Sequence, residues 1–400
     1  MATVLAIISC FFVIPGREYL SYINWRTLIL LFCLMAVVAG FAKAGVFRYI
    51  SRKLSQRMKD TRRLSVGFML LCFLLSMFVT NDVALVTVVP LTLLTMMGCS
   101  EKAKIQTLVQ ETIAANLGSM LTPFGNPQNL YLTSYYGIGM GEFLRLMLPY
   151  TGVALVILLL QTLISPKEGL GGRAREAGTP EGRVKEAAIP EGKNREAASL
   201  YESGENLTGK DEMYEEALRE KLLRSKGRLV SILLYGILFI VSMFSVARIL
   251  DYRILFGIIL ITILVYDRSV LRNVNYTLLL TFVSFFVLIG NLGAMTQIQA
   301  ALTQMIEGRE LLTAILSSQI ISNVPAAVLL SGFTDQGKAL IVGTDLGGLG
   351  TLIASMASII TFQLYSLESG AKKGKYLLTF TLWNVIDLVI LGTVAYCMMR

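Results

Sequence analysis

Two short polar motifs interrupt long apolar stretches of this sequence and carry the side chains best suited to binding chemistry. Thr80-Asn81-Asp82 lies at the centre of residues 65–98, and Ser322-Asn323 lies at the centre of residues 310–333. Hydroxyl and amide oxygens can bind a small hard cation, and the N–H groups at a helix N-terminus can bind an anion. A carboxylate inside an apolar membrane segment is costly, so the position of Asp82 predicts a functional site.

Two further stretches combine helix-breaking residues with polar ones. Residues 105–136 contain Pro123 and Pro127 among glycines, and residues 337–364 contain the run TDLGGLGT. A continuous helix does not tolerate such clusters, so each stretch is predicted to be a membrane crossing that unwinds near its middle, with freed carbonyl groups as additional ligands. The candidate binding residues are Thr80, Asn81, Asp82, Gly118, Thr122, Gly125, Asn126, Ser318, Ser322, Asn323, Thr344, Asp345 and Gly350, with sodium as the candidate ion at Thr80, Asn81, Ser322 and Asn323.

Several of these residues have simpler interpretations. Asp82 and Asp345 could be cation ligands or proton carriers, or they could only cap helix N-termini. The three amides of Asn126-Pro127-Gln128-Asn129 could fix a polar ligand, or they could only bond the backbone of a loop. Glu111 could pair with a lysine such as Lys104.

The composition is that of an all-α, polytopic membrane protein. Of the 400 residues, 54% are hydrophobic and only 16% are charged, and the mean hydropathy is +0.64. The net charge of +9 comes largely from short basic clusters beside apolar spans, which orient a membrane protein, so we expect no nucleic-acid partner. There is no histidine, and five scattered cysteines form no metal-ligand spacing. These absences disfavour an enzyme and exclude histidine-based metal sites and catalytic triads.

The basic clusters and apolar segments together predict a topology in the plasma membrane. Basic residues within 48–63, 224–228 and 372–375 mark the cytoplasmic side. A short span at 2–15 and a second span at 27–47 then place the N-terminus in the cytoplasm. A re-entrant hairpin over 65–98 enters from the cytoplasm, and a second over 310–333 enters from outside. Further crossings are expected at 143–164, 229–247, 254–266, 276–295 and 376–399, which leaves the C-terminus outside.

The chain divides into two membrane regions joined by a polar segment. Residues 1–165 form a first transmembrane repeat, and residues 229–400 form an extra helix followed by a second, inverted repeat. Residues 166–228 contain a decapeptide repeat (GRAREAGTPE, GRVKEAAIPE, GKNREAASLY) and cannot bury enough apolar surface to fold alone. We expect a mostly disordered cytoplasmic linker, helical over 209–225, which is either a tether or a regulatory element.

The two membrane regions can be aligned with each other. Asn24 aligns with Asn275, Thr80-Asn81 with Ser322-Asn323, and Gly118 with Gly350, in the same order of span, span, hairpin, broken crossing and span. Because residues 229–247 add one crossing, the second copy is inverted in the membrane. Paired discontinuous segments in inverted repeats are typical of secondary transporters, whose binding site lies between the repeats at the bilayer midplane.

Three motifs, TNDVALVTVVPLT, LTPFGNPQNLYL and ISNVPAAVLL, resemble the paired signatures of one superfamily of ion transporters. It groups citrate carriers, arsenite pumps, sodium/proton antiporters and divalent-anion/sodium symporters. The resemblance implies a scaffold with a moving transport domain, elevator-type alternating access and usually a homodimer. It also implies an ion-site role for Thr80, Asn81, Ser322 and Asn323. The threonine that follows Ser-Asn in the dicarboxylate branch is replaced by Asp82 and Val324, which makes dicarboxylate specificity doubtful.

Two transporter functions and a channel remain open from the sequence, although two different re-entrant tips on opposite sides favour alternation over a continuous pore. The first is a secondary active transporter that couples a small anion, a carboxylate or an inorganic oxyanion, to sodium or protons. The second keeps the fold but is a sodium/proton antiporter or an arsenite efflux permease, which Asp82 favours. No cofactor is expected other than sodium ions, and the expected partners are the anion, the coupling cation, the lipid bilayer and a second copy of the chain.

Overall fold

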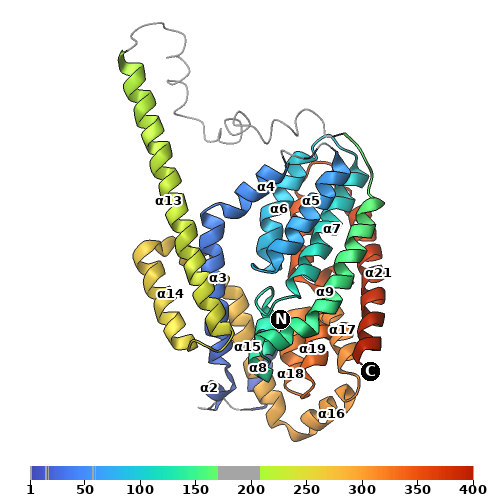
Figure 1. Cartoon of the computed structure of the whole chain (residues 1–400). Helices are drawn as coiled ribbons and strands as arrows, with labels where there is room; N and C mark the ends of the chain where they lie inside the picture. Colours follow the sequence, from blue (N-terminus) through green and yellow to red (C-terminus); the bar gives the residue numbers. More distant parts are fainter. Residues whose placement is uncertain are drawn as a thin grey trace.

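The computed structural model describes residues 2–13, 16, 18–55, 58, 60–169 and 208–399, without the side chains at positions 2, 48, 52, 208–226 and 298. The described residues form helices with no β-strand, which confirms the predicted all-α class (Figure 1). The decapeptide repeat lies outside the described residues. The helix expected over 209–225 is present as the first part of α13 (Thr208–Val246).

The first membrane region contains α1 to α9. Their bounds are α1 (Ala2–Cys10), α2 (Tyr19–Tyr22), α3 (Trp25–Lys43), α4 (Val46–Ser55), α5 (Thr61–Ser76), α6 (Asn81–Thr95), α7 (Glu101–Ser119), α8 (Pro127–Tyr136) and α9 (Met140–Leu163). After α13 the second region contains α14 (Tyr252–Tyr266), η1 (Arg268–Asn273), α15 (Tyr276–Ala294), α16 (Thr296–Ile306), α17 (Glu310–Ile321), α18 (Asn323–Ser331), α19 (Gly337–Leu346), η2 (Leu352–Ala354), α20 (Met356–Ser366) and α21 (Lys373–Met399).

Five of the described helices are long and apolar enough to cross a membrane. They are α3, α9, the part of α13 over Gly227–Val246, α15 and α21, and each coincides with a predicted span. The short span expected over 2–15 contains α1, which has only nine residues. At 1.5 Å per residue it is about 13 Å long, less than half of the roughly 30 Å hydrocarbon core. α1 alone is therefore shorter than a full crossing.

The two helices α3 and α15 begin in the same way. Each is 19 residues long and is preceded by an asparagine whose side chain accepts from the backbone N–H three residues later, Asn24 from Thr27 and Asn275 from Leu278. The two asparagines also share nearly the same backbone angles, φ −80° and ψ 85° against φ −79° and ψ 81°. These matching caps agree with the alignment of Asn24 with Asn275.

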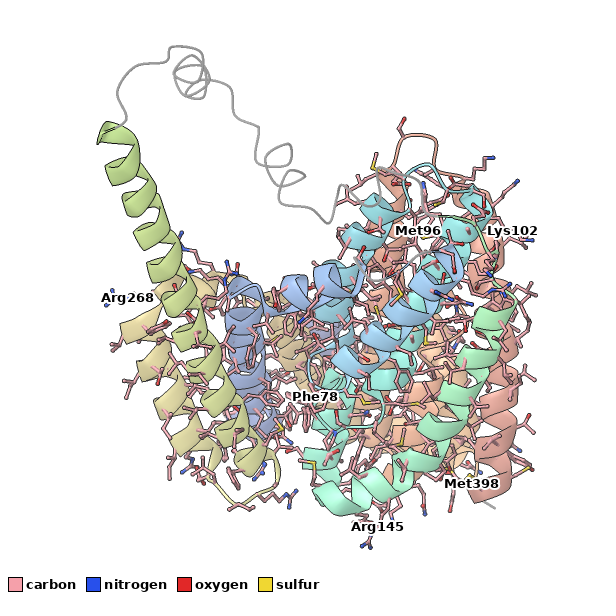
Figure 2. All side chains as sticks on the ribbon, turned by 45° about the horizontal axis from the view of Figure 1, so that its top comes forward. Phe78, Met96, Lys102, Arg145, Arg268 and Met398 are labelled. Carbon is pink, nitrogen blue, oxygen red and sulfur yellow. The ribbon has the colours of Figure 1, made fainter. Side chains whose placement is uncertain are left out.

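The stretch 65–98 is divided into α5 and α6, which pack against each other and are joined by Met77–Thr80. The stretch 310–333 is divided into α17 and α18, which also pack together and are joined at Ser322 alone. Figure 2 places Phe78, in the first connection, in the middle of the molecule, whereas Met96 and Lys102 lie at one end. Arg145 and Met398 lie at the opposite end.

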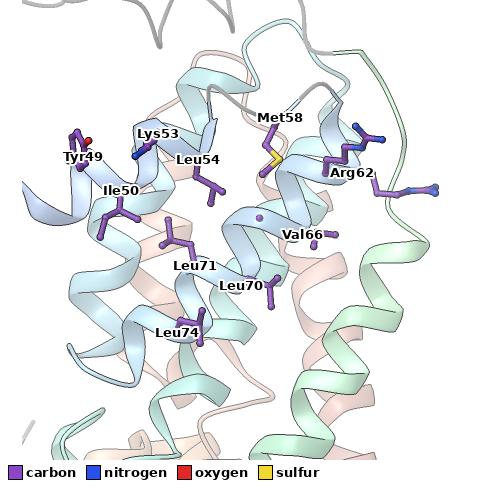
Figure 3. A pocket seen from close by; sticks show the side chains of 12 residues that line it. Tyr49, Ile50, Lys53, Leu54, Met58, Arg62, Val66, Leu70, Leu71 and Leu74 are labelled. Atoms are coloured by element: carbon purple, nitrogen blue, oxygen red, sulfur yellow. The ribbon is translucent and has the colours of Figure 1, made fainter.

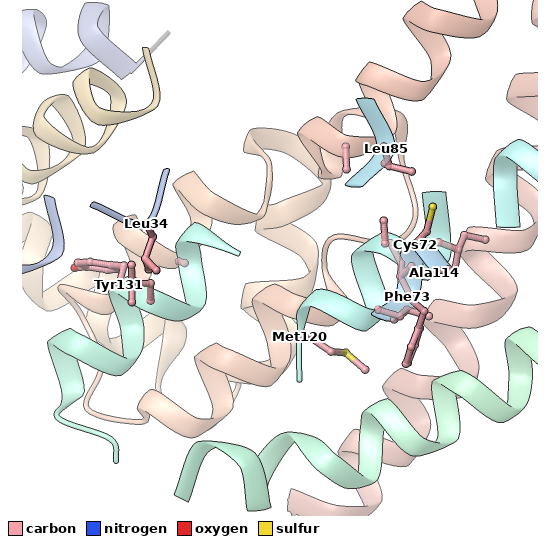
Figure 4. Packing of buried hydrophobic residues seen from close by; sticks show 14 of the residues in the cluster. Leu34, Cys72, Phe73, Leu85, Ala114, Met120 and Tyr131 are labelled. Carbon is pink, nitrogen blue, oxygen red and sulfur yellow. The ribbon is translucent and has the colours of Figure 1, made fainter. Parts of the chain in front are cut away.

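The helix α7 is the centre of the first region. It packs against α5, α6, α9, α20 and α21, and 16 of its 19 residues are buried. In Figure 4, Cys72 and Phe73 of α5 lie beside Ala114 of α7 within the buried apolar cluster. Because protein surrounds it, α7 can carry polar side chains such as Gln106, Gln110 and Asn116 that would be costly against lipid.

Polar breaks follow α7 and α19. After α7, residues 120–126 form turns before α8 begins at Pro127, with Asn126 as its N-cap. After α19, residues 347–355 include the short η2 before α20 begins, with Ser355 at the N-cap position. Proline at the first helical position and an asparagine cap are typical helix starts, so the sequence 126–129 starts α8 instead of continuing α7.

Candidate functional site

Asp345 lies in the last turn of α19 and is held by amide side chains from α8 and its cap. Its Oδ1 accepts from Asn126 Nδ2 at 2.9 Å and from Gln128 Nε2 at 3.3 Å, and its Oδ2 accepts from Asn129 Nδ2 at 2.8 Å. All four side chains are buried. The C-terminal end of a helix carries a negative partial charge, so α19 does not itself stabilise this carboxylate. The donors come from the other half of the chain.

Asn116 holds the corresponding place in the last turns of α7. Its Oδ1 accepts from Ser355 Oγ at 2.9 Å, and its Nδ2 lies 3.5 Å from Ser358 Oγ. Ser355 and Ser358 stand at the start of α20, as Asn126 and Asn129 stand at the start of α8. Each half therefore supplies the beginning of one helix to the polar residue at the end of a helix in the other half.

The broken helices also contact the helix pair of their own half in matching ways. A Cβ at Gly118 would lie 2.6 Å from Ser76 Oγ, and a Cβ at Gly347 would lie 2.5 Å from Ser318 Oγ. Four residues after each glycine there is a threonine. Its hydroxyl donates to a backbone carbonyl that lies three residues before the polar tip of the same half. Thr122 donates to Met77, and Thr351 donates to Gln319 at 3.0 Å.

These contacts correct the alignment of the broken crossings. Asn116 with Asp345, Gly118 with Gly347, and Thr122 with Thr351 are all separated by the same interval, so they make one consistent register. The alignment of Gly118 with Gly350 is three residues out. The residues around both glycines are small or apolar, and many registers of such a stretch look equally good until the contacts of Ser76 and Ser318 are known.

A chain of contacts connects Asn81 to the region of Asn323. Asn81 Nδ2 donates to Asn116 Oδ1 at 3.0 Å, and Asn116 in turn contacts Ser355. The carbonyl of the preceding residue, Ala354, accepts from Ser322 Oγ at 3.2 Å, and Asn323 follows directly. Both asparagines are buried, each with 6% of its surface exposed. The two polar tips predicted from the sequence therefore meet around residues 354–355.

The two aspartates differ from the interpretation as helix caps. Thr80 occupies the N-cap position of α6 without a side-chain cap bond, and Asp82 lies in the first turn. There its charge faces the positive end of the helix dipole, and its buried Oδ1 has no hydrogen-bond partner among the described residues. Asp345 lies at the C-terminal end of a helix, where an N-terminal cap is excluded.

The second tip is held in an unusual backbone conformation. Ser322 has φ 74° and ψ 156°, a region that is essentially restricted to glycine. Its N–H donates to the carbonyl of Ser318 at 3.0 Å and its hydroxyl donates to Ala354. Such strain costs on the order of 1–3 kcal/mol and persists only where surrounding contacts enforce it. The first tip has no such residue, because Thr80 has φ −63°.

Other predicted residues support the site without joining the polar contacts. The hydroxyl of Thr344 donates to Leu340 within its own helix, and Ser318 likewise donates to Ala314. A Cβ at Gly125 would lie 2.2 Å from the carbonyl oxygen of Ser119, so only glycine fits there. Gly350 has φ +102°, and a Cβ on it would collide with Gln319.

Glu111 does not pair with Lys104. Lys104 binds Glu368 at 2.7 Å and lies 3.9 Å from Glu101, whereas the fully buried Glu111 accepts from Thr92 Oγ1 at 2.6 Å. Lys104 stands near the start of α7, two turns away from Glu111, and finds its partner in the loop after α20.

Sequence reasoning missed several residues that organise the site. Gln319 donates to the carbonyls of Gly347 and Leu349, both at 2.9 Å, and accepts from the N–H of Thr351 at 2.9 Å. Asn116, Ser355 and Ser358 were also missed as candidates. The correct register would have found them, because it pairs Asn116 with Asp345 and Ser355 with Asn126.

The described residues contain no group of three or more Cys, Asp or Glu side chains that could hold a metal ion. The oxygens near the tips are instead hydroxyls, amides and single carboxylates from Thr80, Asn81, Asp82, Ser322, Asn323 and Asp345. Oxygen ligands of this kind suit a weakly held alkali cation better than a tightly bound transition metal.

Helices of membrane length around a buried polar network, built from two interrupted helices and two helix pairs, define a multi-pass membrane protein. The comparisons with known proteins identify it as a transporter and not an enzyme. The chain belongs to the citrate transporter family, whose model matches residues 1–336. It is 30% identical to the uncharacterized transporter MJ0456 of Methanocaldococcus jannaschii, over 96% of this chain and 92% of that protein. It is 29% identical to the inner membrane protein YbiR of Escherichia coli, over 89% of this chain and 84% of that protein. A Dictyostelium discoideum protein that carries the transporter name arsB is 29% identical over 38% of this chain and 27% of its own length.

Proposed function

We propose that this transporter moves a small anion, a carboxylate or an inorganic oxyanion, in a secondary active cycle coupled to sodium or protons. The observation that carries the proposal is the reciprocal contact of the two halves, Asn126 with Asp345 and Ser355 with Asn116. A site built from equivalent parts of two halves can open to either side by a similar movement, which is the basis of alternating access.

The same contacts support an inverted repeat. In each half a helix pair, α5–α6 or α17–α18, packs against the first part of a broken crossing, α7 or α19. The second helix of each pair packs against the later part of the other broken crossing, α6 against α20 and α18 against α8. We interpret both pairs as re-entrant hairpins that enter from opposite sides, with the basic residues of 48–63 and 372–375 in the cytoplasm.

Anion and cation have different binding elements in this proposal. The helices α6, α8, α18 and α20 all begin in the buried polar region, and the positive end of each helix dipole there suits an anion. Asn81, Asn323 and the hydroxyls of Thr80 and Ser322 supply oxygens for sodium. Asp345 adds the negative charge that a cation or a proton would neutralise.

The alternative function is sodium/proton antiport or arsenite efflux on the same fold. Asp82 favours it, because a carboxylate at the first tip would repel an anionic substrate unless a cation or proton accompanies it. The similarity to the protein named arsB also points in this direction. Elevator-type movement and a homodimer belong to both versions of the proposal.

A flux screen of reconstituted protein separates these functions. Proteoliposomes should be tested for uptake of citrate, succinate and arsenite under sodium or proton gradients, and for sodium/proton exchange without an anion. We expect Asn81→Ala and Asn323→Ala each to abolish cation-dependent uptake while the protein remains folded. Uptake at the wild-type rate by both variants would remove the two tips from the site.

Asp82→Asn distinguishes the coupling ion. A shifted pH dependence of transport is expected if Asp82 carries a proton. If the pH profile is unchanged while sodium dependence is altered, Asp82 serves sodium instead. If Asp82→Asn alters neither the pH profile nor the sodium dependence of transport, Asp82 only stabilises the first turn of α6.

A further inference from the structure

An apolar groove with a basic end lies between α4 and α5, away from the transport site. Its volume is about 850 Å³, and Tyr49, Ile50, Lys53 and Leu54 line one wall. The other wall and the ends are formed by Met58, Arg62, Arg63, Val66, Gly67, Leu70, Leu71 and Leu74. Figure 3 shows Lys53, Met58 and Arg62 toward one end and Leu74 at the other.

The two faces of α5 explain why the groove is apolar. Leu64, Phe68 and Cys72 are spaced four residues apart, are fully buried, and belong to the face that packs into the core. The groove is lined by a different face, on which Leu74 is 52% exposed and Val66 and Leu70 are only partly buried. These side chains stay partly open in the described part of the chain, so an apolar molecule of the membrane covers their open surface.

The wall formed by α4 is amphipathic. Phe47 is buried, whereas Tyr49 and Ile50 are 60% and 39% exposed. Lys53 follows on the exposed side, with its Nζ 6.0 Å from the centre of the Tyr49 ring. A helix with basic side chains and an exposed apolar face suits the interface between lipid headgroups and acyl chains.

Charge is confined to one end of the groove. Arg63 is 64% exposed on its side chain and reaches Asp60 only at 3.5 Å, and Arg62 donates from Nε to the carbonyl of Ser165. From Arg62 to Leu74 the groove follows α5 for about 18 Å, close to the roughly 15 Å of hydrocarbon in one leaflet. Positive charge at one end and apolar side chains over one leaflet match the shape and polarity of an anionic phospholipid.

We propose that this groove is a binding site for one anionic phospholipid. The headgroup phosphate lies at the end of the groove that carries Lys53, Arg62 and Arg63, and the acyl chains lie along Val66, Leu70 and Leu74. The site is independent of the transported ion, because none of its residues belongs to the contacts around Asn81, Asn116 and Asp345.

Native mass spectrometry of the full chain, in detergent with equal phosphatidylglycerol and phosphatidylcholine, tests headgroup selection. We expect the wild type to retain phosphatidylglycerol preferentially. The double variant Lys53→Gln/Arg63→Gln keeps Arg62 and its bond to Ser165, and it should lose this preference by roughly fivefold for each basic side chain removed. The matched control Lys102→Gln/Arg272→Gln removes the same charge from exposed positions outside the groove and should keep it.

Filling the groove tests the position of the acyl chains. A Cβ added at Gly67 would lie 2.9 Å from Met58 Cε, so there is little free space at this position. The larger side chain of Gly67→Leu should therefore fill the groove and displace phospholipids of both headgroups. If that variant does not fold, Leu71→Trp in a Trp25→Phe/Trp383→Phe background serves instead. Its fluorescence in phosphatidylcholine vesicles should be quenched by phosphatidylglycerol brominated on the acyl chain, and quenched less in the presence of the Lys53→Gln/Arg63→Gln substitutions.

Three results would overturn the proposal. The first is an equal loss of the phosphatidylglycerol preference in Lys53→Gln/Arg63→Gln and in Lys102→Gln/Arg272→Gln. It would mean that the lipid is attracted by the net charge of the protein and not by this groove. The second is an unquenched Leu71→Trp variant. The third is a change of oligomeric mass by Gly67→Leu without any change of bound lipid, which would make this face an interface between copies of the chain.

Discussion

Asn126 Nδ2 lies 2.9 Å from Asp345 Oδ1, although 219 residues separate the two side chains in the sequence. One belongs to the cap of α8 and the other to the last turn of α19. The corresponding contact of Ser355 with Asn116 has the same length, 2.9 Å. Here the donor belongs to the second half and the acceptor to the first, the reverse of the contact between Asn126 and Asp345. The buried polar network therefore depends on both halves at once, and neither half contains all of its members.

Asp345→Asn should weaken both the fold and the transport cycle. Three amide N–H groups converge on the carboxylate, and an asparagine in its place has one acceptor oxygen and an NH₂ group that faces other donors. At least one buried donor then loses its partner, which costs about 1–3 kcal/mol. Thermal unfolding in detergent should show a lower midpoint, and uptake should lose its cation dependence. The exposed Asp335→Asn is the control, and equal behaviour of the two variants would refute the role of Asp345.

Moving the carboxylate to the other half tests the equivalence of the two positions. Asn116→Asp alone places a second acid in the buried network and should be the most damaging single change. Combined with Asp345→Asn, the same substitution leaves one acid in a site that already donates from Asn81 and Ser355. We expect the double variant to lose less stability than the two single variants together, with a coupling energy of about 1–3 kcal/mol in a double-mutant cycle. Strict additivity would contradict the equivalence.

Alanine at Gly118 and Gly347 should be destabilising for different reasons. At Gly118 the new Cβ would lie 2.2 Å from the backbone oxygen of Phe73, which cannot move aside, whereas at Gly347 its nearest neighbour is the side chain of Ser318. Each variant should lose about 1–3 kcal/mol of stability. Ser318→Gly should partly restore Gly347→Ala, but Ser76→Gly should not restore Gly118→Ala. Gly152→Ala, which meets nothing within 4 Å, should leave the unfolding midpoint unchanged or raised.

Ser322→Gly should be more stable than Ser322→Ala. Both variants lack the hydroxyl, but alanine keeps a Cβ at φ 74° and glycine does not, so a difference of about 1 kcal/mol is expected. At Thr80, where φ is −63°, the order should reverse and alanine should be the better replacement. Cation-dependent uptake should fall in both Ser322 variants if the hydroxyl binds the ion. If alanine is the more stable replacement at Ser322 as well, Ser322 is not strained.

The polar pattern of the sequence was sufficient to place the candidate site but not to pair its members. Asp82, Asp345 and the amides of 126–129 were recognisable because polar groups in apolar segments are rare and costly. The partner of Glu111 was not predictable in this way. Lys104, two turns away on the same helix, was a reasonable partner. In the structure, however, Glu111 accepts a hydrogen bond from Thr92, and Lys104 pairs with Glu368. Which donor reaches a buried acid depends on how helices far apart in sequence pack together.

The sequence by itself determined the all-α membrane class, the five long spans and the positions where helices break, because these follow from local hydrophobicity and from proline, glycine and capping residues. Only the tertiary structure decided the register of the two halves and the contacts of Asn126 with Asp345 and of Ser355 with Asn116. The physical reason is that a buried hydrogen bond has to be made by whichever donor the packed helices bring within reach. Apolar periodicity predicts which side chains are buried, but it does not predict which side chain each of them contacts.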